Sequence, residues 1–341
     1  MSFKVVQIWG MLVPTIKDIA NLAGVTFVTV SRALNNEPGV SKETRQKILE
    51  IAKQINYVPN LAAKRLVDRS SNGIGLIWPK REEPFFYRTC KQIQEEASSR
   101  GYTVMVSLAD NEEALRSFQE YFIDRAVCWL SARKTPEFIA AKEQFRGTIL
   151  EVGGREGWKQ EHAHWLDIDR KGAVKLAMSH LVELGHTNIA FMGGHSDKWL
   201  GYTESLVELG LEFRPELNVM TLVANPDMPQ KVRDFTRHFR ENGATAIVID
   251  SEGMLREFVK AAYEEGVRIP EHLSLVVYDD LPETQSMLPV SITTVGPDIA
   301  GLARTIIDLI TDEADAAKEG SYFRKVMPTE LKVRESTRSL G

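Results

Sequence analysis

Two short helical patterns separated by one glycine, within Thr15–Asn35, constrain the fold of this chain most. Thr15, a residue type that favours helix N-caps, precedes the first pattern, and Thr26 precedes the second. Gly24 can end the first helix because glycine adopts left-handed backbone angles without a steric penalty. These features predict a helix-turn-helix. The apolar residues at helical spacing are Ile16, Ile19 and Ala20 in the first helix and Val30 and Leu34 in the second.

A third helix is predicted to close a small all-α core against the first two. Ser41 is placed to cap this helix. The residues of its predicted apolar stripe are Ile48, Leu49, Ala52 and Ile55. The alternative to a helix-turn-helix is an ordinary three-helix domain whose basic face contacts only solvent.

Positive charge is concentrated in this part of the chain. Thr15–Ser70 contains nine Lys and Arg residues against five Asp and Glu residues, whereas the whole chain has a net charge of −5. A basic segment attached to an acidic remainder favours phosphate contact at one end only. With 341 residues, of which 43% are hydrophobic, the chain has room for this small module and a large globular body.

The sequence resembles the lactose-repressor/galactose-repressor (LacI/GalR) family of bacterial transcription regulators. The matching stretches are Thr15–Ala20, Thr29–Arg32 with Asn35, and Asn56–Asn60 leading to Leu66, and weaker similarity continues to about residue 335. The resemblance implies a helix-turn-helix DNA-binding domain at residues 15–58, a hinge helix and linker at 59–72, and an effector-binding and dimerisation domain at 73–341.

The resemblance places the second helix in the major groove of DNA. Phe27 and Val28 occupy the positions that most decide operator sequence in the family, and without side-chain hydrogen bonds they would read thymine methyl groups and shape. Arg32 can donate two parallel hydrogen bonds to guanine. The alternative for Phe27 is a core aromatic. The other residues within 15–58 that match DNA-contacting positions are Lys17, Thr26, Thr29, Ser31, Asn35, Thr44 and Tyr57.

The hinge at residues 59–72 is predicted to contact DNA as well. Asn60 matches a phosphate- or groove-contacting position, and Leu66 matches the leucine that the family inserts between base pairs from the minor groove. Ala63 fits beside Leu66 because a small side chain allows close approach to the groove. A hydrophobic seam between two hinge helices is the other role considered for Leu66. The hinge helix is short, so it is predicted to fold only when it is paired with a second hinge helix and bound to DNA.

Beyond the hinge, apolar strand-like runs alternate with helical patterns, which predicts parallel sheets buried on both faces. Two such series follow each other. They resemble the periplasmic-binding-protein-like body of the family, which consists of two doubly wound parallel-sheet lobes. The predicted bounds are about 73–169 and 296–321 for the N-lobe, and about 170–295 and 322–336 for the C-lobe.

The family holds a small polar effector between its two lobes. Asp169 and Asp279 match positions at strand ends, where open α/β folds bind ligands. Ser251 falls where many relatives have asparagine or aspartate, and Phe85 and Phe86 where relatives have an aromatic wall. A structural role is the alternative for each of these residues.

Lys198 departs from the family pattern. Relatives have an arginine that binds the ligand within Ser-x-x-Arg-x-x-Gly, whereas this chain has the shorter segment Ser196–Gly201. Lysine keeps the positive charge but loses the planar fork, so we expect a sugar-like effector that differs from a simple hexose. Trp199 would either stack on a sugar ring or fill the core.

Other classes of function are not indicated. Cys90 and Cys128 fit no metal-ligand spacing and favour reduced thiols. The sequence contains no nucleophile elbow and no Gly-rich phosphate-loop motif, so we predict no metal, no cofactor and no enzymatic activity. No apolar run is long enough for a transmembrane helix. Residues 1–14 are interpreted as a disordered extension, or as partly untranslated if translation starts at Met11.

The sequence therefore predicts a cytoplasmic, homodimeric regulator of transcription, in particular a repressor controlled by a small-molecule effector. Its partner would be double-stranded operator DNA with a palindromic sequence, because one head covers only a half-site. The alternatives are a solute-binding protein or a sugar-processing enzyme with the same body fold. The first would need a signal peptide and no head, and the second would need catalytic groups.

Overall fold

The computed structural model describes residues 14–58, 72–78, 83–130, 135–153, 163–313 and 321–341. The chain divides into two units, Met1–Ser71 and Asn72–Gly341, which are called the head and the body below. Among the described residues, no helix combines the length and the apolar character that crossing a membrane requires.

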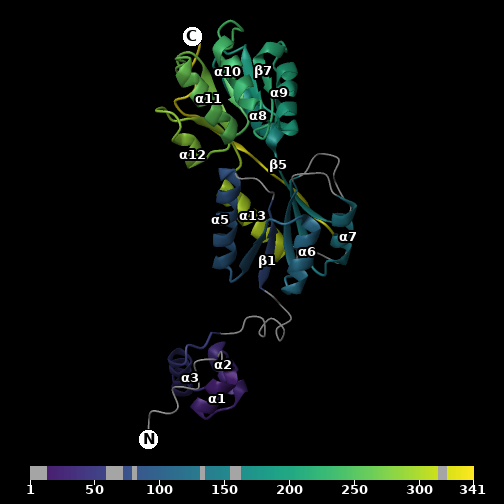
Figure 1. Ribbon diagram of the computed structural model, residues 1–341, viewed down its shortest axis with the longest axis vertical. Helices are drawn as coiled ribbons and strands as arrows, with labels where there is room; N and C mark the ends of the chain where they lie inside the picture. The colour runs from purple at the N-terminus through teal and green to yellow at the C-terminus, as the bar shows by residue number, and fades with distance from the viewer. Residues whose placement is uncertain (1–13, 59–71, 79–82, 131–134, 154–162, 314–320) are drawn as a thin grey trace. The chain divides into compact units, whose positions relative to one another are not determined.

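The described part of the head contains three helices, α1 (Ile16–Ala23), α2 (Phe27–Leu34) and α3 (Lys42–Gln54) (Figure 1). The predicted caps are present. The Thr26 hydroxyl accepts a hydrogen bond from the backbone of Thr29 at 3.2 Å, and the Ser41 hydroxyl accepts one from Thr44 at 3.2 Å. Gly24 has a φ of 71°, the left-handed conformation expected at this helix end. The helix-turn-helix is therefore confirmed.

The core of the head is small and differs from the prediction at one position. Leu49 is 48% exposed, so its place in the predicted apolar stripe of α3 is wrong. Ile51 packs against the core instead, because positions 48, 51, 52 and 55 lie on one helical face. The buried residues of this core are Ile19, Ala20, Ala23, Val30, Ala33, Ile48 and Ala52.

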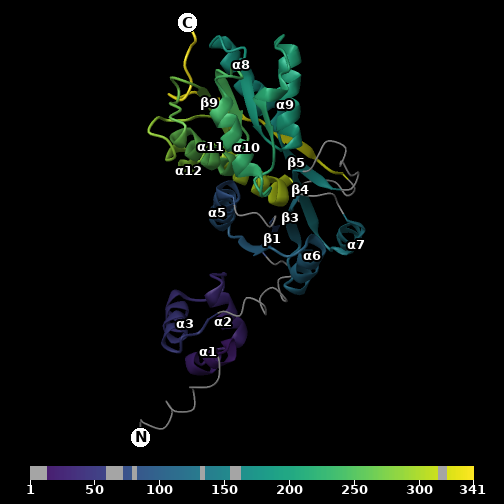
Figure 2. The same ribbon diagram turned by 45° about the horizontal axis from the view of Figure 1, so that its top comes forward.

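The body contains two six-stranded sheets, one in each lobe (Figures 1 and 2). In the N-lobe all pairs are parallel, and the order is β11 (Arg324–Met327), β5 (His164–Ile168), β4 (Thr148–Gly153), β3 (Arg125–Leu130), β1 (Gly73–Ile77), β2 (Thr103–Ser107). In the C-lobe the order is β12 (Glu330–Lys332), β10 (Thr293–Gly296), β9 (Ser274–Tyr278), β8 (Ala246–Ile249), β6 (Ile189–Gly193), β7 (Asn218–Met220), with only β10 and β12 antiparallel. The predicted doubly wound α/β body is therefore confirmed.

Helices cover both faces of each sheet, which explains the continuous apolar strands. The N-lobe has α5 (Pro84–Ser99) and α13 (Ile299–Asp308, followed by a π-helical turn at Leu309–Glu313) on one face, and α6 (Asn111–Glu120) and α7 (Pro136–Gln144) on the other. The C-lobe has α10 (Met228–His238) and α11 (Glu252–Glu264) on one face, and α8 (Arg170–Glu183) and α9 (Ser196–Glu208) on the other. The short helix α12 (Pro282–Gln285) belongs to the C-lobe and contacts α11.

One predicted lobe boundary is wrong. The segment from residue 322 was assigned to the C-lobe, but β11 pairs in parallel with β5, from Arg324 opposite Trp165 to Met327 opposite Ile168. The chain therefore crosses to the C-lobe for the last time between Met327 and Glu330, where β12 begins.

A buried histidine ties the C-terminal segment to the C-lobe. His186 is fully buried, with Nδ1 3.0 Å from the Thr245 hydroxyl and Nε2 3.0 Å from the Arg338 carbonyl oxygen. Because a carbonyl can only accept, the neutral ring donates from Nε2 and accepts at Nδ1. Burial lowers the pKa of His186, and the positive charges of Arg338 and His180 act in the same direction.

The protein is expected to lose stability on acidification through this group. In the unfolded chain His186 binds a proton near pH 6.5, while the folded protein resists protonation, so the free energy of unfolding falls as the pH drops below that value. Urea unfolding at pH 7.5 and 5.5 should show a smaller loss for His186→Gln than for wild type. Equal losses would contradict the assignment. His164 and His180 also have lowered pKa values and leave a residual loss of the same sign in both proteins.

Candidate functional site

The exposed side of α2 is the first candidate site. Phe27 and Val28 begin the helix and are 58% and 44% exposed, and Arg32 is exposed about one turn further on. Phe27 is therefore not a core aromatic. Val30 and Ala33 face the core, so the helix presents an apolar pair and a guanidinium outward from a packed support. This arrangement suits insertion of a recognition helix into the major groove.

The other predicted DNA-contacting residues of the head differ in their surroundings. The hydroxyls of Thr26 and Thr29 lie 2.9 Å apart, and the Thr44 hydroxyl accepts a hydrogen bond from Ser41 at 2.8 Å. Tyr57 packs against the core of the head, so its ring has a structural role that was not predicted. Lys17 and Asn35 are exposed and Ser31 is half-buried. Asn60, Ala63 and Leu66 lie outside the described residues, and their roles stay predictions.

The second candidate site lies at the carboxyl ends of the C-lobe strands. Asp250 directly follows β8, and its carboxylate accepts hydrogen bonds from the backbone of Gly194 at 2.9 Å and His195 at 3.1 Å. Tyr278 ends β9, and Asp279 follows it. Asp250 and Tyr278 are not among the site residues predicted from the sequence. Their position at the end of a continuous apolar strand was the available signal, because open α/β folds bind ligands there.

Lys198 is buried within this site. Its Nζ donates a hydrogen bond to the Asp250 carbonyl oxygen at 2.5 Å and lies 3.4 Å from the centroid of the Tyr278 ring, a cation–π contact. Burial lowers the pKa of Lys198, while the negative charges of Asp250 and Asp279 oppose that shift. The ammonium group is thus held by the protein itself, which differs from the predicted direct contact with an effector.

Three buried oxygen atoms of the site have no hydrogen-bond partner among the described residues: Ser251 Oγ, Tyr278 Oη and Asp279 Oδ1. Asp279 also has a φ of 75°, which is rare for a residue with a side chain. Burial raises the pKa of Asp279 to about 6, although Lys198 acts against this shift. A buried polar atom without a partner costs stability, so this group of atoms indicates a place where a hydrogen-bonding ligand is bound.

Among the described residues, the charges around this place are mainly negative. Arg170 is a second cation near Lys198 and Asp279, but it forms an ion pair with Asp167 at 2.8 Å. The carboxylates whose charges influence Lys198, Tyr278 or Asp279 are those of Glu83, Asp167, Asp169, Asp250 and Asp279. A surplus of carboxylates repels an anionic ligand. No cluster of side chains suited to a metal ion occurs within the described parts of the chain.

Asp169 and Trp199 make contacts within the protein, and the effector contacts predicted for them stay predictions. The Asp169 carboxylate accepts a hydrogen bond from the backbone of Gly172 at 2.8 Å and so caps α8. A Cβ at position 172 would lie 2.1 Å from this carboxylate, so a larger residue there would displace the cap. The Trp199 ring packs against Phe191 and Tyr202 at centroid distances of 5.7 and 5.5 Å, which is the core-filling alternative.

Phe85 and Phe86 form an aromatic cluster inside the N-lobe. They are only 9% and 8% exposed. Phe86 packs edge-on against Trp78 at 5.2 Å and against Trp129 at 5.6 Å. This geometry does not provide the predicted open aromatic wall. The effector contacts predicted for Ser251, Lys198 and Asp279 stay predictions.

Comparison with known proteins identifies a family domain in the head and another in the body. Residues 15–60 match the family model "Bacterial regulatory proteins, lacI family", and residues 178–337 match the "Periplasmic binding protein-like domain". The ribose operon repressor of Halalkalibacterium halodurans is 30% identical over 332 residues, covering 95% of this chain and 97% of the relative. The probable transcriptional repressor ExuR of Bacillus subtilis (strain 168) is 28% identical, covering 96% and 99%.

Among solved structures, the lac repressor dimer bound to operator and the anti-inducer ONPF superposes with a TM-score of 0.79 at 21% identity, covering 96% of this chain and 99% of that one. This similarity shows a shared fold. The ribose operon repressor is similar along nearly its whole length, and the head matches the family's own model. This chain therefore belongs to the lacI family of bacterial regulatory proteins.

Proposed function

We propose that this protein is a transcriptional repressor that binds a palindromic operator as a homodimer. A sugar-like effector either weakens or strengthens this binding. The outward display of Phe27, Val28 and Arg32 on α2 carries the proposal. One head offers one recognition helix, and a two-fold symmetric pair of heads reads two half-sites. One relative that is similar over nearly its whole length is named as a repressor, and a second is named as a probable repressor.

Arg32→Ala is expected to weaken specific binding much more than binding to random DNA. A bidentate contact with guanine is worth roughly 1–3 kcal/mol of discrimination, which is about 5- to 150-fold. Lys17→Ala should weaken both kinds of binding alike, because a phosphate contact does not depend on sequence. The measurement is anisotropy titration of a duplex that wild-type protein selects from a random pool, and of a scrambled duplex.

Equal losses on both duplexes for Arg32→Ala would remove α2 from the recognition surface. Failure of wild-type protein to select any duplex would contradict the whole proposal and favour a solute-binding protein or a sugar-processing enzyme. Family membership supports a regulator, and we propose that the body binds its ligand without converting it.

The effector is proposed to be an uncharged polyhydroxy compound. The unpartnered oxygens of Ser251, Tyr278 and Asp279 can together donate to and accept from several hydroxyl groups. The surplus of carboxylates among the described residues around them disfavours sugar acids and sugar phosphates. D-ribose is the first compound to test, because a relative is a ribose operon repressor and a structure of similar fold contains bound ribose.

A thermal-shift screen tests this class directly. A ligand that binds only the folded state raises the unfolding temperature, and the rise grows with the logarithm of the ratio of its concentration to its Kd. D-ribose and other neutral sugars should raise it, whereas hexuronates and ribose 5-phosphate should not. A shift with the anionic compounds alone would overturn the proposed class without affecting the role of the head.

A further inference from the structure

The segment Asp279–Glu283, which follows β9, contacts both lobes of the body. Asp279 belongs to the effector site proposed above, and Asp280 is bound within the C-lobe. Leu281 and Glu283 contact the N-lobe. Five consecutive residues thus connect the proposed effector site to the contact between the lobes.

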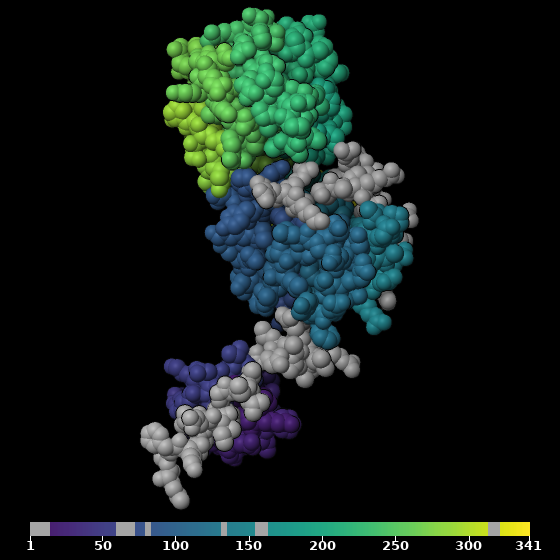
Figure 3. Space-filling model, in the orientation of Figure 1, coloured from purple at the N-terminus to yellow at the C-terminus, as the bar shows by residue number. Residues whose placement is uncertain are grey.

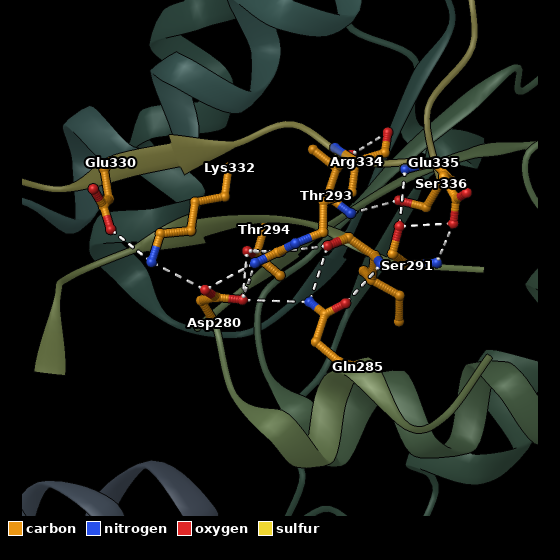
Figure 4. A network of polar contacts seen from close by, with 11 residues as sticks. Asp280, Gln285, Ser291, Thr293, Thr294, Glu330, Lys332, Arg334, Glu335 and Ser336 are labelled. Atoms are coloured by element: carbon orange, nitrogen blue, oxygen red, sulfur yellow. Dashed lines mark hydrogen bonds and ion pairs between the residues drawn. The ribbon is translucent and has the colours of Figure 1, made fainter. Parts of the chain in front are cut away.

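Asp280 anchors this segment to the C-lobe (Figure 4). Its two carboxylate oxygens accept hydrogen bonds from Arg334 Nη2 at 2.9 and 3.0 Å. The Thr294 hydroxyl of β10 donates to it at 3.0 Å, and the Lys332 ammonium of β12 lies at 3.1 Å. Arg334 also donates to the Ile292 carbonyl oxygen at 2.7 Å. Because these contacts all lie within the C-lobe, the segment moves with that lobe.

The next residues of the segment reach the N-lobe. Leu281 is 1% exposed and belongs to the buried cluster that contains Phe85 and Phe86. Arg88 of α5 donates from Nε and Nη2 to the two carboxylate oxygens of Glu283, each at 2.7 Å. Both views of the ribbon place α12 beside the end of α5 nearest the C-lobe (Figures 1 and 2). In Figure 3 the yellow-green part of the C-lobe rests on the dark-blue part of the N-lobe on this side.

We infer that Arg88 and Glu283 form a latch between the lobes that sets the equilibrium between different lobe arrangements. A rotation of the C-lobe that moves α12 away from α5 must break this two-hydrogen-bond contact. An effector changes operator affinity only by binding two arrangements unequally. The latch therefore changes the effector concentration needed for a response without touching the effector. This regulatory consequence rests on the proposed function, whereas the latch itself does not.

The latch can be tested by measuring distances between the lobes in the ligand-free protein. Spin labels are attached at Glu120→Cys on α6 and Val207→Cys on α9, two exposed positions, in a Cys90→Ser background. Pulsed electron double resonance then gives the distribution of distances. Arg88→Ala should change the ratio of populations about two- to five-fold, the range of a partly exposed ion pair. Arg88→Glu should change it more, because two carboxylates then face each other.

The swapped pair Arg88→Glu/Glu283→Arg is the decisive variant. It should restore the wild-type distribution, because the two charges exchange places. Arg214→Glu is the matched control. Arg214 pairs with Glu216 within the C-lobe, and these side chains are 29% and 43% exposed, against 35% and 37% for the latch. It should leave the distribution unchanged.

Two results would overturn the latch: a wild-type distribution in both Arg88 variants, or a swapped pair that stays as altered as Arg88→Glu alone. The experiment uses neither operator nor sugar. Failure of the latch is therefore distinguishable from failure of the proposed function, which the duplex selection and the sugar screen decide.

Discussion

Asp279→Asn is expected to make the ligand-free body more stable at neutral pH while abolishing its response to the effector. The backbone of Asp279 has a φ of 75°, and one buried oxygen of its carboxylate has no hydrogen-bond partner among the described residues. Asparagine tolerates the same backbone angles and carries no charge to desolvate. The asparagine side chain has one oxygen and carries an NH2 group in place of the other. Hydrogen bonds that effector hydroxyls donate to that second oxygen are therefore lost. We expect at least a 100-fold weaker response, which corresponds to about 2.7 kcal/mol or more.

The gain in stability should depend on pH in a defined direction. Burial raises the pKa of Asp279 from 3.8 to about 6, so the folded protein binds a proton more readily than the unfolded chain. This carboxylate therefore contributes stability below pH 3.8, and the contribution is lost as the pH rises through 6. Asp279→Asn should be more stable than wild type by about 1–2 kcal/mol at pH 7.5, a range reduced for the lost attraction to Lys198. The difference should vanish below pH 4.

Asp280→Asn is the matched control, because the neighbouring aspartate has the opposite environment. Burial alone would raise the pKa of Asp280, but hydrogen bonds from Arg334, Lys332 and Thr294 outweigh it, and the net shift is downward. Its contribution to stability is present above pH 3.8 and is lost as the pH falls below that value. Asp280→Asn should therefore destabilise the body at pH 7.5. Urea unfolding from pH 4 to 8 measures both variants, and the same sign for both would contradict this assignment.

The parts of the fold that depend on local chemistry could be predicted from the sequence. Helix ends follow from side chains three residues away, as for Thr26 and Ser41, and from the backbone freedom of Gly24. The strands of the body are short apolar runs, and parallel sheets covered on both faces produce that pattern. The last crossing of the chain from the N-lobe to the C-lobe could not be placed from local patterns. Its position depends on the pairing of β11 with β5, which lies more than 150 residues earlier in the chain.

The candidate effector site was less predictable, because its geometry depends on contacts between distant segments. The Lys198 ammonium donates a hydrogen bond to the Asp250 carbonyl oxygen, 52 residues away. No periodic pattern in the sequence indicates a contact between residues this far apart. Trp199 could fill the core or stack on a sugar, and only the positions of Phe191 and Tyr202 decide between these roles. Asp279 was predicted because it matches a family position at a strand end, where open α/β folds bind ligands.

Ile48→Ala is expected to unfold the head and abolish binding to every duplex, while the body remains folded. Ile48 is completely buried, and the only other large side chains in the fully buried core of the described head are Ile19 and Val30. Removing a buried isoleucine side chain costs about 2–5 kcal/mol. A domain this small has little stability beyond that. Differential scanning calorimetry should show loss of the head transition, and anisotropy should show at least a 100-fold weaker affinity for specific and random duplexes alike.

Leu49→Ala, at the adjacent residue, is the control that makes this prediction specific. The sequence pattern places Leu49 in the apolar stripe, but the structure leaves it 48% exposed, because a helix turns by about 100° per residue. Its truncation should change the stability of the head by no more than about 0.5 kcal/mol, and it should leave duplex binding within a few-fold of wild type. If Leu49→Ala unfolded the head as Ile48→Ala does, α3 would pack with a different face than the one described. The body transition should be the same in both variants, because the head and the body are separate units.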